Sequence, residues 1–201
     1  MTAVPDYWKA SSIRVLFKKG DDRLPENYRP ICIIPILYKL FSRVLCARIR
    51  DRLNAEQSCD QAGFRPDYSC DDHLFAATIL AEKCNEFNLP LWVATLDFKK
   101  AFDSIHHSSI WDALLAHGVP HAYIRILSNL YQGQRASIHA DEKSREFPIL
   151  RGTKQGDPIS SFISNAVLEE VMRKVKTKCA TKIRQTTWLW PWFYYDEPPV
   201  C

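Results

Sequence analysis

The 201-residue sequence lacks the segments that direct a chain into a membrane or out of the cell. Its apolar stretches, such as residues 31–37, fall short of the roughly 18 residues that a transmembrane helix needs. The first ten residues, MTAVPDYWKA, have neither the basic region nor the apolar core of a signal peptide. These absences predict an intracellular protein of the cytoplasm or nucleus that is not secreted and does not enter a membrane.

Cysteine pairs at the spacing of metal ligands are also missing. The seven cysteines are an odd number, and none belongs to a CxxC pair or to the pattern of a zinc ribbon or finger. A reducing compartment, with thiols that fill the core, therefore explains them better than a disulfide framework.

The composition shows no extreme in polarity or charge. Hydrophobic residues make up 46% and charged residues 25%, which excludes a wholly disordered chain or an acidic tail. The formal net charge of +4 permits contact with nucleic acid but does not require it.

Helical and strand patterns alternate between residues 13 and 178. Apolar spacing predicts five helices, at about residues 37–53, 71–87, 108–118, 121–131 and 158–178. Ser108 and Ser109 are expected to cap the third of these, and Pro158 to open the last. Residues 91–98 predict a buried strand, and residues 136–139 with 147–150 predict a hairpin. We therefore expect an α+β fold.

Asp97 ends the predicted buried strand and is the first candidate for chemistry. A carboxylate at the edge of an apolar strand is costly unless it is paired or holds a cation. Two lysines follow directly, and Asp103 lies six residues further on. Asp97 therefore caps the next helix, pairs with a lysine or holds a cation.

The loop RGTKQGDPISS, at residues 151–161, is the second candidate. Gly152 and Gly156 allow close approach of another backbone or a ligand, and Gln155 can both donate and accept hydrogen bonds. A helix N-terminus nearby favours negative groups. The alternative is an ordinary loop before a helix that starts with proline.

Two further blocks place an arginine beside an aromatic residue. Arg29 lies in NYRPI at residues 27–31, and Arg65 lies in QAGFR at residues 61–65. Each arginine is either solvated or positioned to grip phosphate oxygens in a bidentate manner.

The order NYRPI, QAGFR, LDFKKAFDSI and GTKQGDPIS resembles the reverse transcriptase domain of a LINE-type, non-long-terminal-repeat retrotransposon, over about residues 8–178. This resemblance implies the fingers and a partial palm of a right-hand polymerase, with helices on a small antiparallel sheet and no thumb. Residues 1–90 would form a fingers-like region and residues 91–180 the partial palm. Residues 181–201 form an aberrant tail, rich in aromatic residues and proline.

The resemblance also implies roles for single residues. Asp97 would be a catalytic carboxylate that binds metal, and Phe98 would offer its carbonyl to a second metal ion. The residues implied to contact nucleotide or template are the aromatic gate Phe102, Gln155 and Gly156 beside the nascent pair, and the arginines Arg29 and Arg65. Asp103 is expected to be structural.

The implied reaction is DNA synthesis on an RNA template. Two Mg²⁺ ions would hold the attacking and leaving oxygens during nucleotidyl transfer. The implied partners are an RNA template, a DNA primer and deoxynucleoside triphosphates, while the oligomeric state is left open.

The sequence departs from this family in its metal ligands. The family supplies a pair of adjacent aspartates in the motif [F/Y]-A-D-D, and no such pair follows Gln155. Tyr194–Tyr195–Asp196–Glu197 stands about where the pair belongs. Asp196 is therefore a candidate metal ligand, with Glu197 in the second place. However, two prolines follow at once and would block the return strand. The tail is alternatively an out-of-frame or aberrantly spliced end.

Three hypotheses follow. We favour a truncated member of the family without polymerase activity. The alternatives are a minimal polymerase that uses Asp196 and Glu197, and a nucleic-acid-binding remnant. The last would use two basic runs, Arg43, Arg48, Arg50 and Arg52, and then Arg173, Lys174, Lys176, Lys178, Lys182 and Arg184. Both runs could equally be solvated faces.

His106 and His107 lack partners at zinc spacing and are expected to be surface or capping residues.

Overall fold

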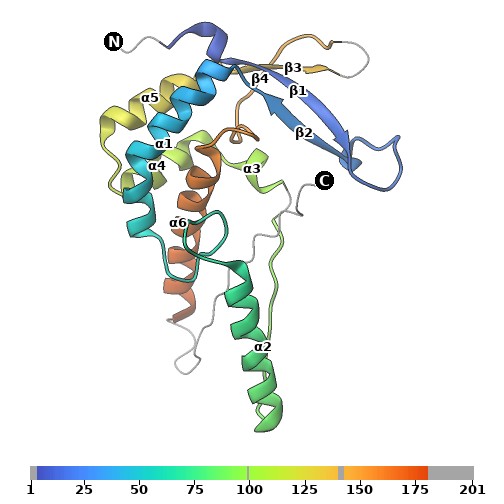
Figure 1. The fold of residues 1–201 in the computed structure, drawn as a ribbon, viewed down its shortest axis with the longest axis vertical. Helices are drawn as coiled ribbons and strands as arrows, with labels where there is room; N and C mark the ends of the chain where they lie inside the picture. The colour runs from blue at the N-terminus through green and yellow to red at the C-terminus, as the bar shows by residue number, and fades with distance from the viewer. Residues whose placement is uncertain (1–3, 99, 140–142, 181–201) are drawn as a thin grey trace.

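The computed structural model describes residues 4–98, 100–139 and 143–180. These residues form a group of packed helices beside a small sheet (Figure 1). The strands are β1 (Ala10–Phe17), β2 (Tyr28–Ile33), β3 (Arg135–His139) and β4 (Phe147–Pro148). The α-helices are α1 (Ile36–Glu56), α2 (Cys70–Glu86), α3 (Ala101–Ser104), α4 (His107–Ala116), α5 (His121–Tyr131) and α6 (Ser160–Ala180). Short 3₁₀ turns, η1 (Asp6–Trp8) and η2 (Pro25–Asn27), precede β1 and β2.

The sheet joins segments that lie far apart in the sequence. Its strand order is β2-β1-β3-β4, and β1 pairs with β2 in antiparallel and with β3 in parallel orientation. β3 and β4 are antiparallel, which confirms the predicted hairpin. The expectation of a purely antiparallel sheet is therefore wrong at one pair, because the chain leaves β1 and returns beside it only after five helices. The α+β fold itself is confirmed.

The core lies between α1, α4, α5 and α6 (Figure 1). α1 buries a stripe that includes Leu45, Ile49 and Leu53, spaced at three to four residues as an amphipathic helix requires. Ile110 of α4 and Ile163 of α6 are fully buried against it. Burial of each such side chain stabilises the folded state by about 1.5–3 kcal/mol. This core fixes the start of α6, which follows the loop at residues 151–157.

Most helix boundaries agree with the sequence patterns. α5 has the predicted bounds, and α4 ends just before Gly118, whose φ of +67° suits glycine. The predicted serine caps of α4 are wrong, because the helix already begins at His107, with His106 in the cap position. Pro158 precedes the first residue of α6 by two positions.

The predicted buried strand at residues 91–98 is also wrong. These residues have no regular secondary structure and all are exposed, with Trp92 93% and Val93 76% accessible. A strand needs a hydrogen-bonding neighbour, and no described residue pairs with this segment. In Figure 1, α2 extends away from the core helices, and this segment leads back from its far end towards α3. Every residue of α2 retains contact with solvent.

None of the described helices combines the length and the apolar character needed to span a bilayer.

The predicted division into two regions at residue 90 stays a prediction. The structure shows that the sheet draws strands from both sides of it.

Candidate functional site

The glycine loop, residues 151–157, is held directly against α3. The Gly152 N–H donates to the Ile105 carbonyl at 2.7 Å, and the Thr153 N–H donates to the Phe102 carbonyl at 2.8 Å. Gly152 has a φ of +88°, and a Cβ at this position would lie 2.9 Å from both Cα and O of Asp103. Only glycine allows this contact. The AFDS and GTKQGDP blocks are therefore neighbours.

The other end of the glycine loop lies against β2. A Cβ on Gly156 would come within 3.3 Å of the Cys32 carbonyl oxygen, and the φ of Gly156 is +94°. Burial raises the pKa of the Cys32 thiol, so this cysteine stays protonated at neutral pH. The strand that carries most of NYRPI, β2, thus forms a wall beside Gly156.

A hollow of about 420 Å³ opens where these three segments meet. Its lining includes Ile13, Pro30, Cys32, Asp103, Arg151 and Gln155. The Gln155 side chain lies close enough to the Asp103 carboxyl group to act on its pKa. Burial raises the pKa of Asp103, while Lys100 and Gln155 act in the opposite direction. Asp103 is half-buried beside Gln155, and its structural role stays a prediction.

Phe102 links this hollow to the QAGFR block. Its ring packs edge-on against the ring of Phe64, with 6.0 Å between centroids. Phe64 has a left-handed φ of 54°. This backbone conformation is energetically unfavourable for any residue other than glycine. Through this ring contact the QAGFR block joins α3 and the glycine loop, while Pro30 of NYRPI lines the hollow beside them.

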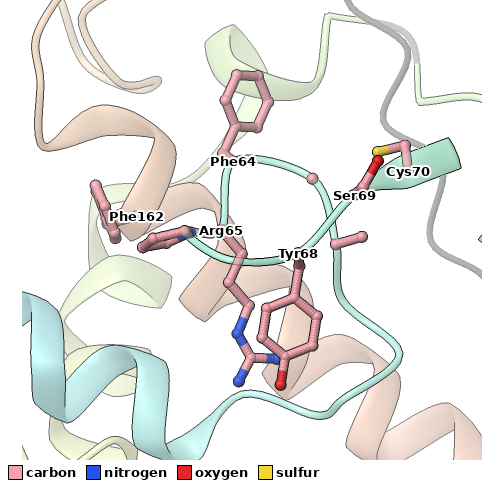
Figure 2. Close-up of a pocket in the computed structure, with 9 residues that line it drawn as sticks. Phe64, Arg65, Tyr68, Ser69, Cys70 and Phe162 are labelled. Atoms are coloured by element: carbon pink, nitrogen blue, oxygen red, sulfur yellow. The ribbon is translucent and has the colours of Figure 1, made fainter. Parts of the chain in front are cut away.

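Arg65 borders a second hollow, of about 580 Å³, shown in Figure 2. Its Nη1 donates to the Ser58 carbonyl at 2.6 Å, and its Nη2 donates to the Asn54 carbonyl at 3.2 Å, near the C-terminus of α1. The guanidinium carbon lies 3.9 Å from the centre of the Tyr68 ring. Figure 2 shows Arg65 and Tyr68 side by side, while Phe64 points the opposite way from the loop. A phosphate at Arg65 would have to compete with these carbonyl acceptors.

Arg29 lies on the other face of its strand from the first hollow. Pro30 and Cys32 line that hollow, and successive side chains of a strand point to opposite faces. Arg29 is half-buried and lies opposite Leu16 of β1. Its predicted contact with nucleotide stays a prediction.

Asp97 and Phe98 lie on the exposed segment at residues 91–98. Among the residues that the structure describes, no three His, Cys, Asp or Glu side chains gather closely enough to hold a metal ion. The described residues alone therefore do not fit the magnesium centre that the resemblance implies. Asp196 and Glu197, the other predicted ligands, lie outside the described residues.

The two histidines after α3 make structural contacts. His106 pairs with Arg151 as an isolated β-bridge, and His107 Nε2 lies 3.2 Å from the Gly152 carbonyl oxygen. The His107 ring also packs edge-on against Tyr131, at 5.1 Å between centroids. Burial lowers the pKa of His107, so at neutral pH it is uncharged. Exposed His106 in the cap position agrees with the prediction, whereas half-buried His107 is a packing residue.

Four residues near Gln155 and Gly156 escaped sequence reasoning. Lys154 and Asp157 flank the pair and are buried, although charged residues in a loop are normally exposed. Tyr38 and Ser42 of α1 are buried beside them. The flanking charges in KQGD were the available signal, but nothing in the sequence marked their partners on α1.

The two basic runs differ in their surroundings. Arg43 and Arg48 are exposed on α1. On α6, Arg173 forms ion pairs with Glu56, Glu169 and Glu170, and Lys176 Nζ lies 2.6 Å from the Asp60 carboxylate. Paired side chains are less available to phosphates. Lys182 and Arg184 lie outside the described residues.

Comparison with known proteins identifies a family whose match includes all four sequence blocks. A family model described as reverse transcriptase (RNA-dependent DNA polymerase) matches residues 17–190. The retrovirus-related Pol polyprotein from the type-2 retrotransposable element R2DM of Drosophila melanogaster is 31% identical over 160 residues, which cover 79% of this chain and 15% of that protein. The corresponding polyprotein from the type-1 element R2 of Popillia japonica is 33% identical over 172 residues, which cover 84% of this chain and 24% of that protein.

A third relative, a putative 115 kDa protein in the type-1 element R1DM of Drosophila melanogaster, is 26% identical over 181 residues, covering 87% of this chain and 17% of that protein. The chain therefore spans less than a quarter of the length of these relatives. The family match extends over most of the chain and includes all four sequence blocks. The chain belongs to the reverse transcriptase family of non-long-terminal-repeat retrotransposons.

Proposed function

We propose that this chain supplies the nucleotide- and template-contacting part of a retrotransposon reverse transcriptase domain and does not polymerise DNA on its own. One contrast carries the proposal. The glycine loop, α3 and β2 converge around Gln155, whereas Asp97 is exposed on a segment without secondary structure. A polymerase needs both parts at one place.

The family's activity is RNA-templated synthesis of DNA, with a primer and deoxynucleoside triphosphates as the other partners. In this proposal Gln155 and Gly156 contact the nascent pair, and Phe102 lies under the sugar. Divalent metal would supply the charge neutralisation that phosphoryl transfer requires. Asp97 is the described residue assigned to that metal, and the work of the chain itself is to bind and orient. Such a role belongs in the cytoplasm or the nucleus.

Primer extension on an RNA template with Mg²⁺ tests the proposal. We expect no incorporation from protein whose circular dichroism shows that it is folded. The Asp97→Ala variant is the matched control, because any contaminating polymerase would act equally in both preparations. Incorporation that disappears in Asp97→Ala and in Asp196→Ala would overturn the proposal and establish a minimal polymerase.

Nucleic-acid binding without catalysis is the second candidate. The exposed arginines Arg43 and Arg48 of α1 favour it, since they face solvent while Arg173 and Lys176 of α6 are paired with acids. Phosphate contacts made by such residues weaken steeply as salt rises.

A further inference from the structure

Tyr38 of α1 contacts both residues that flank Gln155 and Gly156. Its hydroxyl donates to Oδ2 of Asp157 at 2.6 Å. The Lys154 ammonium lies 4.4 Å from the centre of the same ring, within the range of a cation–π interaction. Tyr38 is only 1% exposed, so both contacts are shielded from water. One side chain thus spans the two positions between which Gln155 and Gly156 lie.

The Asp157 carboxylate has a second anchor on α1. The Ser42 hydroxyl donates to Oδ1, and Ser42 lies one helical turn after Tyr38, on the same face. The Ile159 N–H, at 3.4 Å from Oδ1, adds a contact from the chain before α6. A buried carboxyl group that loses such donors keeps the full cost of its desolvation. These contacts therefore make displacement of Asp157 unfavourable.

Lys154 is anchored at the opposite end. Its Nζ donates to the Trp8 carbonyl at 3.2 Å, and its own carbonyl accepts from the Asp157 N–H at 3.1 Å and the Ser160 hydroxyl at 2.8 Å. Burial lowers the pKa of Lys154, while the nearby Asp157 acts to raise it. Both flanks of the Gln155–Gly156 pair are consequently fixed to the helical core.

We infer that Tyr38, Ser42, Lys154 and Asp157 form a buried clamp that positions Gln155 and Gly156 beside the hollow. Lys154 also lines the hollow, whereas Tyr38, Ser42 and Asp157 do not, so these three are positioning residues. Their effect passes through the backbone of residues 154–157, which the two anchors hold at both ends. The inference depends on the proposed function only for what Gln155 and Gly156 contact.

Amide hydrogen exchange in the Tyr38→Phe variant tests the clamp, because this change removes one hydroxyl and keeps the ring over Lys154. The reporters are the Thr153 and Asp157 N–H groups, which donate to the Phe102 and Lys154 carbonyls. We expect their exchange to accelerate by roughly tenfold or more, the effect of losing a hydrogen bond to a buried charged group. The NMR signals of the Gln155 side-chain amide should shift as well.

Tyr28→Phe is the matched control. It removes a tyrosine hydroxyl that donates to the Asp22 carbonyl at 2.8 Å in an exposed position. Ser42→Ala gives an independent test if Tyr38→Phe does not fold, and it should accelerate the same amides. Exchange that is unchanged at Thr153 and Asp157, or that accelerates equally throughout α4 and α5, would overturn the inference. The readout needs no catalysis, so a negative primer-extension result leaves it interpretable.

Discussion

Gly152 shows at the scale of one residue why the glycine loop tolerates so little change. Two constraints coincide there, a left-handed backbone and contact with the backbone of Asp103. Each constraint alone favours glycine, and together they tie the loop to α3. A substitution at this position therefore tests whether the two sequence blocks depend on each other.

We predict that Gly152→Ala lowers the free energy of unfolding by more than Gly118→Ala does. Both glycines have positive φ, which costs alanine about 1–2 kcal/mol. A Cβ on Gly118 would meet no atom within 4 Å, whereas one on Gly152 would collide with Asp103. The collision should add about 1–3 kcal/mol. Urea unfolding of both variants measures the difference, and equal losses would contradict the role of the contact.

At the scale of elements, an ion pair connects α6 with the segment that follows α1. Lys176 Nζ lies 2.6 Å from Oδ2 of Asp60, which also accepts from the Ser58 hydroxyl. Burial acts to raise the pKa of Asp60, but the bonds from Lys176 and Ser58 outweigh it and the pKa is lowered. A carboxyl group with a lowered pKa in the folded state stabilises the fold above its ordinary pKa.

We therefore predict that Lys176→Met destabilises the fold at pH 7 and that this loss shrinks as the pH falls below about 4, where an ordinary carboxyl group becomes protonated. The half-exposed pair should contribute about 0.5–1 kcal/mol. Lys174→Met removes an exposed lysine from the same helix and serves as the control. Thermal unfolding at pH 7 and pH 3 measures both variants. A loss that stays constant over this range would show that the ion pair is not its cause.

Local signals explain which elements the sequence could predict. α5 follows Pro120 and carries its own apolar spacing, so its bounds could be read directly. Residues 91–98 have an equally clear strand pattern, but a strand exists only with a neighbour, and the pattern cannot supply one. The clamp was missed for a similar reason. Tyr38 and Asp157 lie 119 residues apart, and neither residue signals the other.

At the scale of the whole molecule, the distribution of basic residues without acidic neighbours decides where a nucleic acid would lie. The α1 run offers exposed arginines, while Arg173 and Lys176 on α6 are already neutralised by acids. Replacing two basic residues by glutamine on either helix changes the net charge by the same amount, so the effects on RNA binding can be compared directly.

We predict that the double variant Arg43→Gln/Arg48→Gln binds RNA more weakly than the unaltered chain. A plot of the logarithm of the binding constant against the logarithm of the salt concentration should also become less steep, by about one for each phosphate that the variant no longer neutralises. Arg173→Gln/Lys176→Gln should change this slope little. Fluorescence anisotropy with a labelled RNA, over a series of salt concentrations, measures both. Equal slopes in the two double variants and the unaltered chain would exclude a phosphate-binding surface on α1.

The parallel pairing of β1 with β3 has a consequence for the order in which the chain folds. β1 meets β2 soon after both are synthesised, because only residues 18–27 separate them. Its other neighbour, β3, leaves the ribosome much later, and α6 later still. Contacts between segments so distant in sequence form slowly. During synthesis, the growing chain would thus present a hairpin and α1 before the glycine loop has any partner to hold it.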